Sequence, residues 1–334
     1  YDNDDIIELS KVFTGLGAGA MDEEARNEGR ELQFSTHQNH MDYTVPMKMY
    51  EEEHEPGEKY LLNDFVIPAG QSGMADIEMA VDHLFKHPNV GPFIGRKLIQ
   101  QLVKSNPSPA YIQDVVAAFN DNGDGERGNM LAVIKAILLH EEARDCLWQT
   151  ESTNGKLLSP TIRYAAFARA MRLQANNDLY YEEGNGFFDN TFHRVLSSPS
   201  VFNFYSPDHM PNGPLTEMGL VAPEFEIFNS VTSIGYLNRV DRWTDRGDVF
   251  TARELTDDVE VVKSHYYEMA RDPRVLINHL DRMLTKGRLK NNTREFIVEA
   301  ISGLPDWNEE NMLRDRWEIA AYLIMISPEF NILK

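Results

Sequence analysis

The chain has 334 residues, of which 42% are hydrophobic and 25% charged, and this length can bury a large core without disulfides or metals. Acidic residues outnumber basic ones 53 to 32, which gives a net charge of −21 and argues against nucleic acid or an anionic membrane surface as a partner. The single cysteine, Cys146, excludes an intrachain disulfide, and no apolar run approaches the roughly 18 residues of a membrane span.

The first predicted element is a helix that starts near the first residue. Asp2 or Asn3 can cap it, and glycines at 15 and 17 end it. Its apolar face contains Ile6, Leu9, Val12 and Phe13. Residues 31–67 differ, because stretches that favour strands alternate with polar, acidic loops, so we expect a small irregular β excursion there.

Helical periodicity returns at Ala75, and helices dominate the chain from there to its end. Helices are predicted over 75–86, 92–104, 109–119, 130–139, 223–243, 256–270, 272–286, 291–302 and 309–326, with a further helix near Pro160. In the second of these we expect Leu102 to be buried and Gln100 to face away from the core. The pattern predicts a mainly α, multi-helical single domain, 1–334, with possible lobes 1–150 and 151–334. Cys146 is expected to be buried, because a free cysteine packs like a small hydrophobe.

The polar loop at 120–128 resembles part of a calcium-binding loop. Asn120, Asn122 and Asp124 fall at its first, third and fifth positions, and Asp121 is a further candidate. The twelfth position holds Leu131, where such a loop needs a glutamate. Calcium therefore stays one interpretation, beside a structural turn in which these side chains make local hydrogen bonds.

Three further groups of residues have the types that carry chemistry. His37, His40 and His54 lie near glutamates 51–53, where a metal site and solvated surface histidines are the alternatives. Ser72 sits in a glycine-flanked turn and Asp76 follows it, which indicates a helix cap and a first-turn acid better than a nucleophile. The segment from 199 to 223 mixes aromatic residues with Asn, Asp and His, so it either lines a ligand cleft or is a long loop held down by its rings.

Several segments together resemble the bacterial family catalogued as domain of unknown function 1800. HEPGEKYLL (54–62) resembles the family's H-D-x-x-x-K-x-x-L box, with Glu55 where Asp is usual. The other similar segments span nearly the whole chain: PAGQSGMADIEMAVDHLFKHPNVGPFIGRKLIQQLVKSNPSPAYI (68–112), FNDNGDGERGNMLAVIKAILLHEEAR (119–144), PSVFNFYSPDHMPNG (199–213), LVAPEFEI (220–227) and AAYLIMISPEF (320–330).

The resemblance implies an exported bacterial protein, placed in the periplasm, at the cell surface or outside the cell. It also implies that this chain is the C-terminal bulk of a longer protein. Its implied neighbour is a sulfatase-like protein of the family called domain of unknown function 1501. No activity, cofactor or catalytic residue comes with the resemblance. His54 and Lys59 occupy polar positions of the family's box, and Arg96 and Lys97 those of the following helix.

Two functional hypotheses follow. The first is a structural or interaction protein that assembles with itself or with the sulfatase-like neighbour, because no catalytic motif is complete. The second is an extracellular hydrolase or metal-dependent enzyme, with a site near His54, Lys59, Asp76 and Arg96 and with calcium as the only candidate cofactor. Whether the chain is an enzyme stays open at this point.

Overall fold

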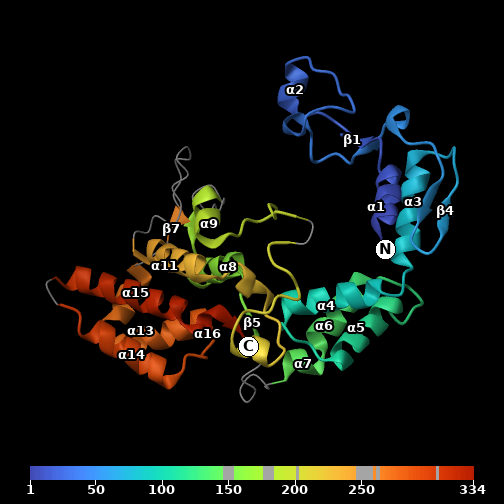
Figure 1. Ribbon diagram of the computed structural model, residues 1–334. Coiled ribbons are helices and arrows are strands. Elements are labelled where there is room, and N and C mark those ends of the chain that lie inside the picture. The colour runs from blue at the N-terminus through green and yellow to red at the C-terminus, as the bar shows by residue number, and fades with distance from the viewer. Residues whose placement is uncertain (146–153, 176–183, 201–202, 246–258, 261–263, 306–307) are drawn as a thin grey trace. The chain divides into compact units, whose positions relative to one another are not determined.

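The computed structural model describes residues 1–145, 154–175, 184–200, 203–245, 259–260, 264–305 and 308–334 (Figure 1). Cys146, predicted to be buried, lies outside these residues. Helices dominate the described chain and its sheets are two-stranded, so the prediction of a mainly α fold with a small β excursion is confirmed. No helix in these ranges is long and apolar enough to cross a membrane.

The chain forms two compact units, Tyr1–Phe93 and Ile94–Lys334. This boundary differs from the one between the possible lobes 1–150 and 151–334. The single domain with those lobes stays a prediction.

The first unit combines helices with short strands. In chain order its elements are α1 (Asn3–Val12), β1 (Leu16–Gly17), α2 (Glu23–Asn27), the 3-10 turn η1 (Gln38–His40), β2 (Lys48–Met49), the 3-10 turn η2 (Glu51–Glu53), β3 (Lys59–Leu61), β4 (Phe65–Ile67) and α3 (Gly73–Phe85). Asp2 caps α1 by accepting from the backbone of Asp4 and Asp5, and the Asp5 side chain bonds back to Asp2 N, which completes a capping box. Ser72 caps α3, as predicted.

The strands of the first unit form two antiparallel pairs, of which β2, β3 and β4 fall within the predicted β excursion at 31–67. β1 pairs with β2, and β3 with β4 in a hairpin that places Lys59 opposite Ile67 and Tyr60 opposite Val66. Alternate residues of a strand point to opposite faces, so this hairpin buries Leu61 and Ile67 against α1 and α3. Of the predicted apolar face of α1, only Val12 is fully buried; Ile6 and Phe13 are exposed.

The second unit begins within α4 (Val90–Leu102) and continues with α5 (Pro109–Asn120), α6 (Met130–Leu139) and α7 (Glu141–Arg144). Ser108 caps α5, whose first residue is the proline that marked its start in the sequence. The predicted orientation of α4 is wrong at its end. Gln100 is 6% exposed and Leu102 is 42% exposed, because Gln100 donates to the carbonyls of Ser105 and Pro207 in the interior.

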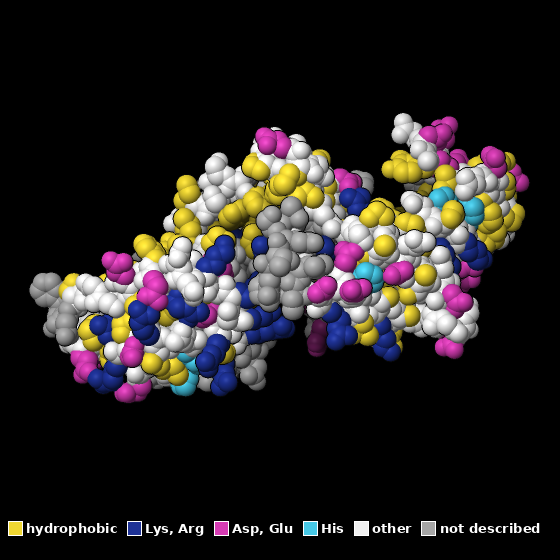
Figure 2. Space-filling model, turned by 90° about the horizontal axis from the view of Figure 1, so that it is seen from below, with side chains coloured by type: hydrophobic (Ala, Val, Ile, Leu, Met, Phe, Trp, Pro, Cys, Tyr) yellow, Lys and Arg dark blue, Asp and Glu magenta, His cyan; other side chains and the backbone are white. Residues whose placement is uncertain are grey.

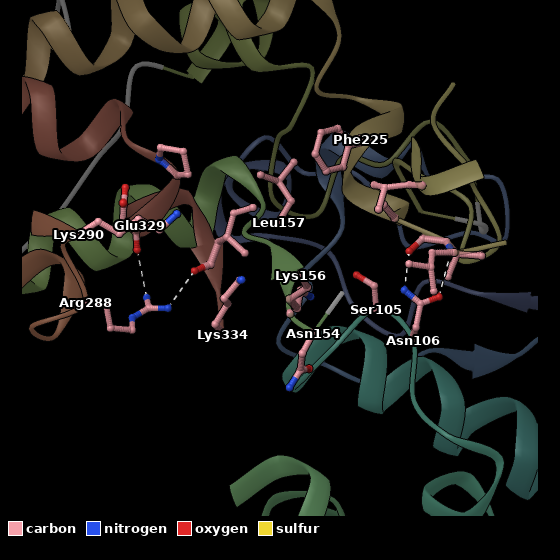
Figure 3. Close-up of a pocket in the computed structure, with 17 residues that line it drawn as sticks. Ser105, Asn106, Asn154, Lys156, Leu157, Phe225, Arg288, Lys290, Glu329 and Lys334 are labelled. Atoms are coloured by element: carbon pink, nitrogen blue, oxygen red, sulfur yellow. Dashed lines mark hydrogen bonds between the residues drawn. The ribbon is translucent and has the colours of Figure 1, made fainter. Parts of the chain in front are cut away.

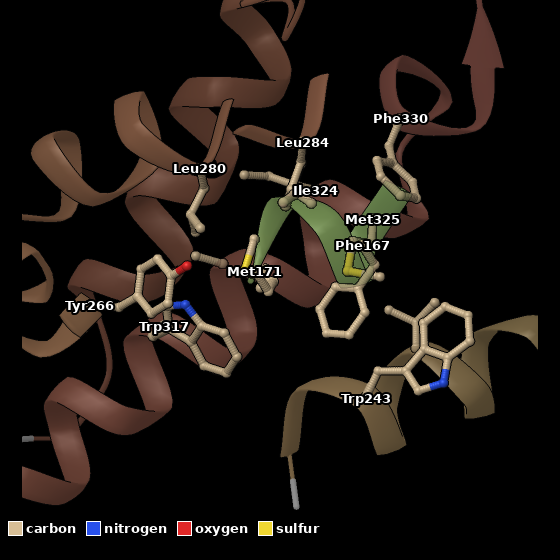
Figure 4. Close-up of a cluster of buried hydrophobic side chains, with 14 of the residues drawn as sticks. Phe167, Met171, Trp243, Tyr266, Leu280, Leu284, Trp317, Ile324, Met325 and Phe330 are labelled. Atoms are coloured by element: carbon tan, nitrogen blue, oxygen red, sulfur yellow. The ribbon is translucent and has the colours of Figure 1, made fainter. Parts of the chain in front are cut away.

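Most helices of the rest of the second unit pack around one hydrophobic core (Figure 4). Its elements are β5 (Lys156–Leu157), α8 (Pro160–Ala170), β6 (Gln174–Ala175), α9 (Gly184–Thr191), α10 (Pro214–Glu217), the 3-10 helix η4 (Pro223–Glu226), α11 (Ser230–Asp245), β7 (Val259–Glu260), α12 (Ser264–Ala270), α13 (Pro273–Leu280), the π-helical turn η5 (Asp281–Thr285), α14 (Asn291–Ser302), α15 (Glu309–Ile326), α16 (Pro328–Asn331) and β8 (Ile332–Leu333). Trp243, Trp317 and Phe167 are among its largest fully buried side chains.

Two short strand pairs in this unit join segments that are far apart in the sequence. β5 pairs with β8, which joins the residues before α8 to the end of the chain, and β6 pairs with β7. Gly155 precedes β5 with φ +124°, a conformation that a residue with a Cβ atom adopts only with strain. An added Cβ there would also lie 2.6 Å from Leu333 O, so glycine permits the close approach of the two strands.

Candidate functional site

Three of the four candidate site residues meet in the interior of the first unit. His54 follows η2, Lys59 opens β3, and Asp76 lies in the first turn of α3. His54 Nε2 lies 3.1 Å from Asp76 Oδ2, and the Lys59 ammonium donates to the same oxygen. Gln71 Nε2 donates to Asp76 Oδ1 at 2.6 Å, and His54 Nδ1 lies 2.9 Å from Thr14 O. The side chains of Lys59 and Asp76 are each 1% exposed.

The ammonium group of Lys59 and the hydroxyl of Thr14 are fully engaged in this cluster. Besides Asp76, Lys59 donates to the carbonyls of Glu55 at 2.6 Å and Gly57 at 3.1 Å, which uses its three N–H bonds. The hydroxyl of Thr14 donates to Lys11 O and accepts from the backbone of Glu55. No donor of the ammonium is left for a substrate.

The pKa of Asp76 reflects two opposing effects, burial of the carboxyl group and hydrogen bonds to its charged form. Burial alone raises the pKa of this carboxyl, since water no longer solvates its charge. Hydrogen bonds from Lys59, Gln71 and His54 outweigh burial and hold the pKa below its usual value of 3.8. Asp76 is therefore the anion that binds the end of α1, the start of β3 and the start of α3 together.

Arg96 belongs to the second unit. It lies on α4, half exposed, and its guanidinium donates to Asp208 at 2.6 Å. Lys97, next along α4, lines a small cavity of about 120 Å³ together with Gln100, Tyr205 and Glu224. The structure thus brings His54, Lys59 and Asp76 together, and places Arg96 against the 199–223 segment, whose Tyr205 is buried.

In the loop proposed for calcium, the side-chain oxygens of Asn120, Asp121 and Asn122 accept local hydrogen bonds. Asp121 Oδ1 accepts from the backbone of Gly123 and Gly125, which lowers the pKa of that carboxyl. Asn122 Oδ1 accepts from the backbone of Asp124 at 2.9 Å and of residue 126 at 3.2 Å. The side-chain oxygen of Asn120 accepts from Arg127. Side-chain oxygens of Asp121 and Asn122 thus satisfy backbone N–H groups of the turn. Calcium at Asn120, Asn122 and Asp124 stays a prediction.

The predicted histidine set is divided between two settings. His37 is exposed and caps η1, with its Nδ1 accepting from the backbone of Asn39 at 3.2 Å. The rings of His37 and His40 lie 6.3 Å apart, whereas His54 is buried on Asp76. Within the described ranges no three His, Cys, Asp or Glu side chains are grouped as metal ligands.

A larger cavity that the sequence did not reveal lies in the second unit. Its volume is about 440 Å³, within the range of ligand pockets. A buried ion pair stands at its edge: Lys156 Nζ lies 2.7 Å from Glu224 Oε1, and both side chains are almost inaccessible. Lys156 carried no motif, and Glu224 lay unnoticed within LVAPEFEI; only the resemblance of that segment to a family box could have drawn attention to it.

The comparisons with known proteins identify the family and no activity. The model of the family described as "Protein of unknown function (DUF1800)" matches residues 1–332, and the chain belongs to this family. No curated protein and no solved structure matches the chain.

Proposed function

Since the chain belongs to a family of unknown function, we propose that it is a structural or interaction protein, exported to the cell surface or beyond. Its partners would be a second copy of itself or the sulfatase-like neighbour that the family resemblance implies. Two structural features support this proposal, an exposed apolar helix face and a closed polar cluster.

The exposed apolar face is on α6. Val133 and Ile137 are buried toward α5, where Tyr111 Oη donates to Ile137 O at 2.6 Å. On the other side Leu131 is 65% exposed and Leu138 is 47% exposed. Residues seven apart lie on one face of a helix, so these two leucines form a stripe, which Leu139 widens. Exposed apolar groups that cluster mark interaction surfaces, and this stripe is the observation on which the proposal rests.

The polar surface around such groups is mixed. Figure 2 shows hydrophobic side chains exposed among Lys, Arg, Asp and Glu on the face that it displays. Apolar contacts surrounded by charged groups are typical of an interface core with a polar rim.

The closed cluster in the first unit supports the same function. His54, Lys59 and Asp76 use their hydrogen-bonding groups on one another and on the backbone, and all three are buried. A catalytic base needs access to a proton of its substrate. This arrangement instead stabilises the unit by joining α1, β3 and α3.

Sedimentation velocity tests the proposal, on the protein alone and mixed with the sulfatase-like neighbour. We expect an assembly that the double substitution Leu131→Gln, Leu138→Gln abolishes. Leu196→Gln is the control, because Leu196 is a fully exposed leucine in a loop away from α6, and its replacement should leave assembly unchanged. A monomeric wild-type protein that also fails to bind the neighbour would refute the proposal.

A hydrolytic or metal-dependent enzyme is the second candidate, favoured by the contact between His54 and Asp76, which resembles a base held by a carboxylate. Elemental analysis of the purified protein and hydrolysis assays of wild type and His54→Ala separate the two. No bound metal, together with equal rates in both proteins, would exclude this candidate.

A further inference from the structure

The cavity of about 440 Å³ in the second unit is built from five chain segments (Figure 3). They are the loop after α4, the approach to β5, residues 215–225, the turn between η5 and α14, and α16 with β8. In Figure 3, Arg288, Lys290 and Lys334 lie at one end, Ser105 and Asn106 at the other, and Leu157 and Phe225 between them. The cavity therefore has a basic end, a polar end and an apolar wall.

The charge of the lining is opposite to that of the chain. Among the described residues around the cavity, four are basic, namely Lys156, Arg288, Lys290 and Lys334, and Glu329 is acidic. The whole chain has 53 acidic and 32 basic residues, so most of its surface repels an anion. An anion is attracted here because the local balance is reversed.

Lys156 is already neutralised. It pairs with Glu224 and donates to the carbonyls of Gln100 at 2.6 Å and Gln101 at 2.9 Å. Its role is to hold the cavity wall together. The charges left for a ligand are those of Arg288, Lys290 and Lys334.

Arg288 is held in place by the backbone. Its Nε donates to Thr285 O at 2.9 Å, and its two terminal nitrogens donate to the carbonyls of Ile332 and Glu329, each at 3.2 Å. A guanidinium has five N–H bonds, so two remain. Burial lowers the pKa of Arg288, although the nearby carboxylates of Glu329 and Asp281 oppose this. An anion at this point would offset the burial of the charge.

Lys290 and Lys334 are exposed beside Arg288. No carboxylate of the described chain lies within ion-pair distance of either ammonium group. Two flexible cations at the mouth of a cavity, next to a fixed guanidinium inside it, suit a headgroup with several acceptor oxygens.

The remaining wall is apolar. It consists of Leu157, Leu215, Leu220, Val221, Ala222, Phe225, Pro328 and Ile332. Asn106 fixes part of this wall, because its side chain both donates to Val221 O at 2.8 Å and accepts from Val221 N at 3.0 Å. Burial of a ligand's methylene groups against this wall removes apolar surface from water and so favours binding.

We propose that this cavity binds an anionic amphiphile, with its acidic headgroup on Arg288, Lys290 and Lys334 and its aliphatic chain against Leu157 and Phe225. The molecule is either free in solution, as a fatty acid is, or part of a lipid bilayer. The site is separate from the α6 face and does not depend on assembly.

Calorimetric titration with decanoate, below the concentration at which it forms micelles, tests the site. The double substitution Lys290→Glu, Lys334→Glu should weaken binding at least tenfold, because it replaces two attractive charges by two repulsive ones. Lys135→Glu is the matched control, since this exposed lysine lies on α6 outside the cavity and its loss should leave affinity unchanged. Decanol, which lacks the charge, should bind at least tenfold more weakly than decanoate.

Vesicles separate the two sources. Phosphatidylcholine vesicles with and without phosphatidylglycerol are sedimented with wild type and with the Lys290→Glu, Lys334→Glu variant. Binding of decanoate without vesicle binding assigns a free ligand. Sedimentation that needs phosphatidylglycerol, and that the variant loses, assigns a bilayer lipid. The proposal is overturned if neither probe binds, or if Lys135→Glu weakens binding as much as the cavity variant does.

Discussion

Replacement of Asp76 by Asn tests the central contact of the first unit. Asp76 and Lys59 are each 1% exposed, and the carboxylate is the only anion among the hydrogen-bond partners of the ammonium in the described structure. Asp76→Asn leaves a buried ammonium with two carbonyl groups and no counter-charge, and it turns an amide N–H toward donors. Breaking a buried ion pair from one side costs about 3–5 kcal/mol, so we expect that loss of stability in this unit.

The assay must report on the first unit alone. All four tryptophans lie beyond residue 94, so fluorescence follows only the second unit. Hydrogen exchange of peptides from α1, β3 and α3 measures the first unit directly. We expect exchange in these peptides to accelerate by at least a hundredfold, while tryptophan fluorescence stays unchanged.

Two comparisons complete this experiment. Asp82→Asn removes the partner of Lys86 in a pair that is about three-quarters exposed, and it should leave exchange unchanged. Adding Lys59→Met to Asp76→Asn should recover part of the loss, since no buried ammonium then remains. A cost of less than about 1 kcal/mol for Asp76→Asn, a value typical of an exposed pair, would contradict the role of Asp76 as the buried counter-charge of Lys59.

The remaining predictions concern pH and backbone strain. Burial and the charge of Arg163 lower the pKa of His193 from 6.5 to about 4, so the stability of the folded state is intact above pH 6.5 and falls toward pH 4. With a discount for solvent screening, the free energy of unfolding should fall by about 2 kcal/mol. Urea unfolding monitored by tryptophan fluorescence should show this fall in wild type and not in His193→Gln. The pKa of Asp76 is lowered in the folded state, so its charge contributes stability above pH 3.8 that is lost as the pH falls through the folded-state pKa. Hydrogen exchange in α3 should therefore accelerate below pH 3.8 in wild type but not in Asp76→Asn. Gly155→Ala should lower the free energy of unfolding by more than the ~1–2 kcal/mol that a positive φ costs, because the new Cβ atom meets Leu333 O. Gly123→Ala has open space around it and should cost only the amount due to its positive φ. Thermal unfolding measures both variants, and equal losses of stability would contradict the close approach at Gly155.

The start of each helix could be predicted where a local hydrogen bond decides it. Ser72 and Ser108 each accept from the third residue after them, and Pro109 supplies a fixed φ at the first helical position. The β excursion was likewise visible, since its strands alternate over a few residues. These features depend on neighbours in the sequence, and the chain therefore encodes them locally.

The family box pointed to His54 and Lys59, but their contact with Asp76 is a tertiary property. Three separate elements must converge before a lysine can be buried with its charge satisfied. The same holds for Gln100, which is buried because carbonyl groups of Ser105 and Pro207 accept from it, while Leu102 on the same helix is left exposed.

By itself the sequence determined a mainly helical, acidic chain with a β excursion, its helix caps and its family. Periodicity and capping need only residues within a few positions of one another. Only the tertiary structure decided which charges are buried and which remain for a ligand. Lys156 is neutralised because folding brings Glu224 to it, whereas Arg288 stays a cation with two N–H bonds left over. The basic cavity in an acidic chain follows from that pairing of distant residues, which no local pattern records.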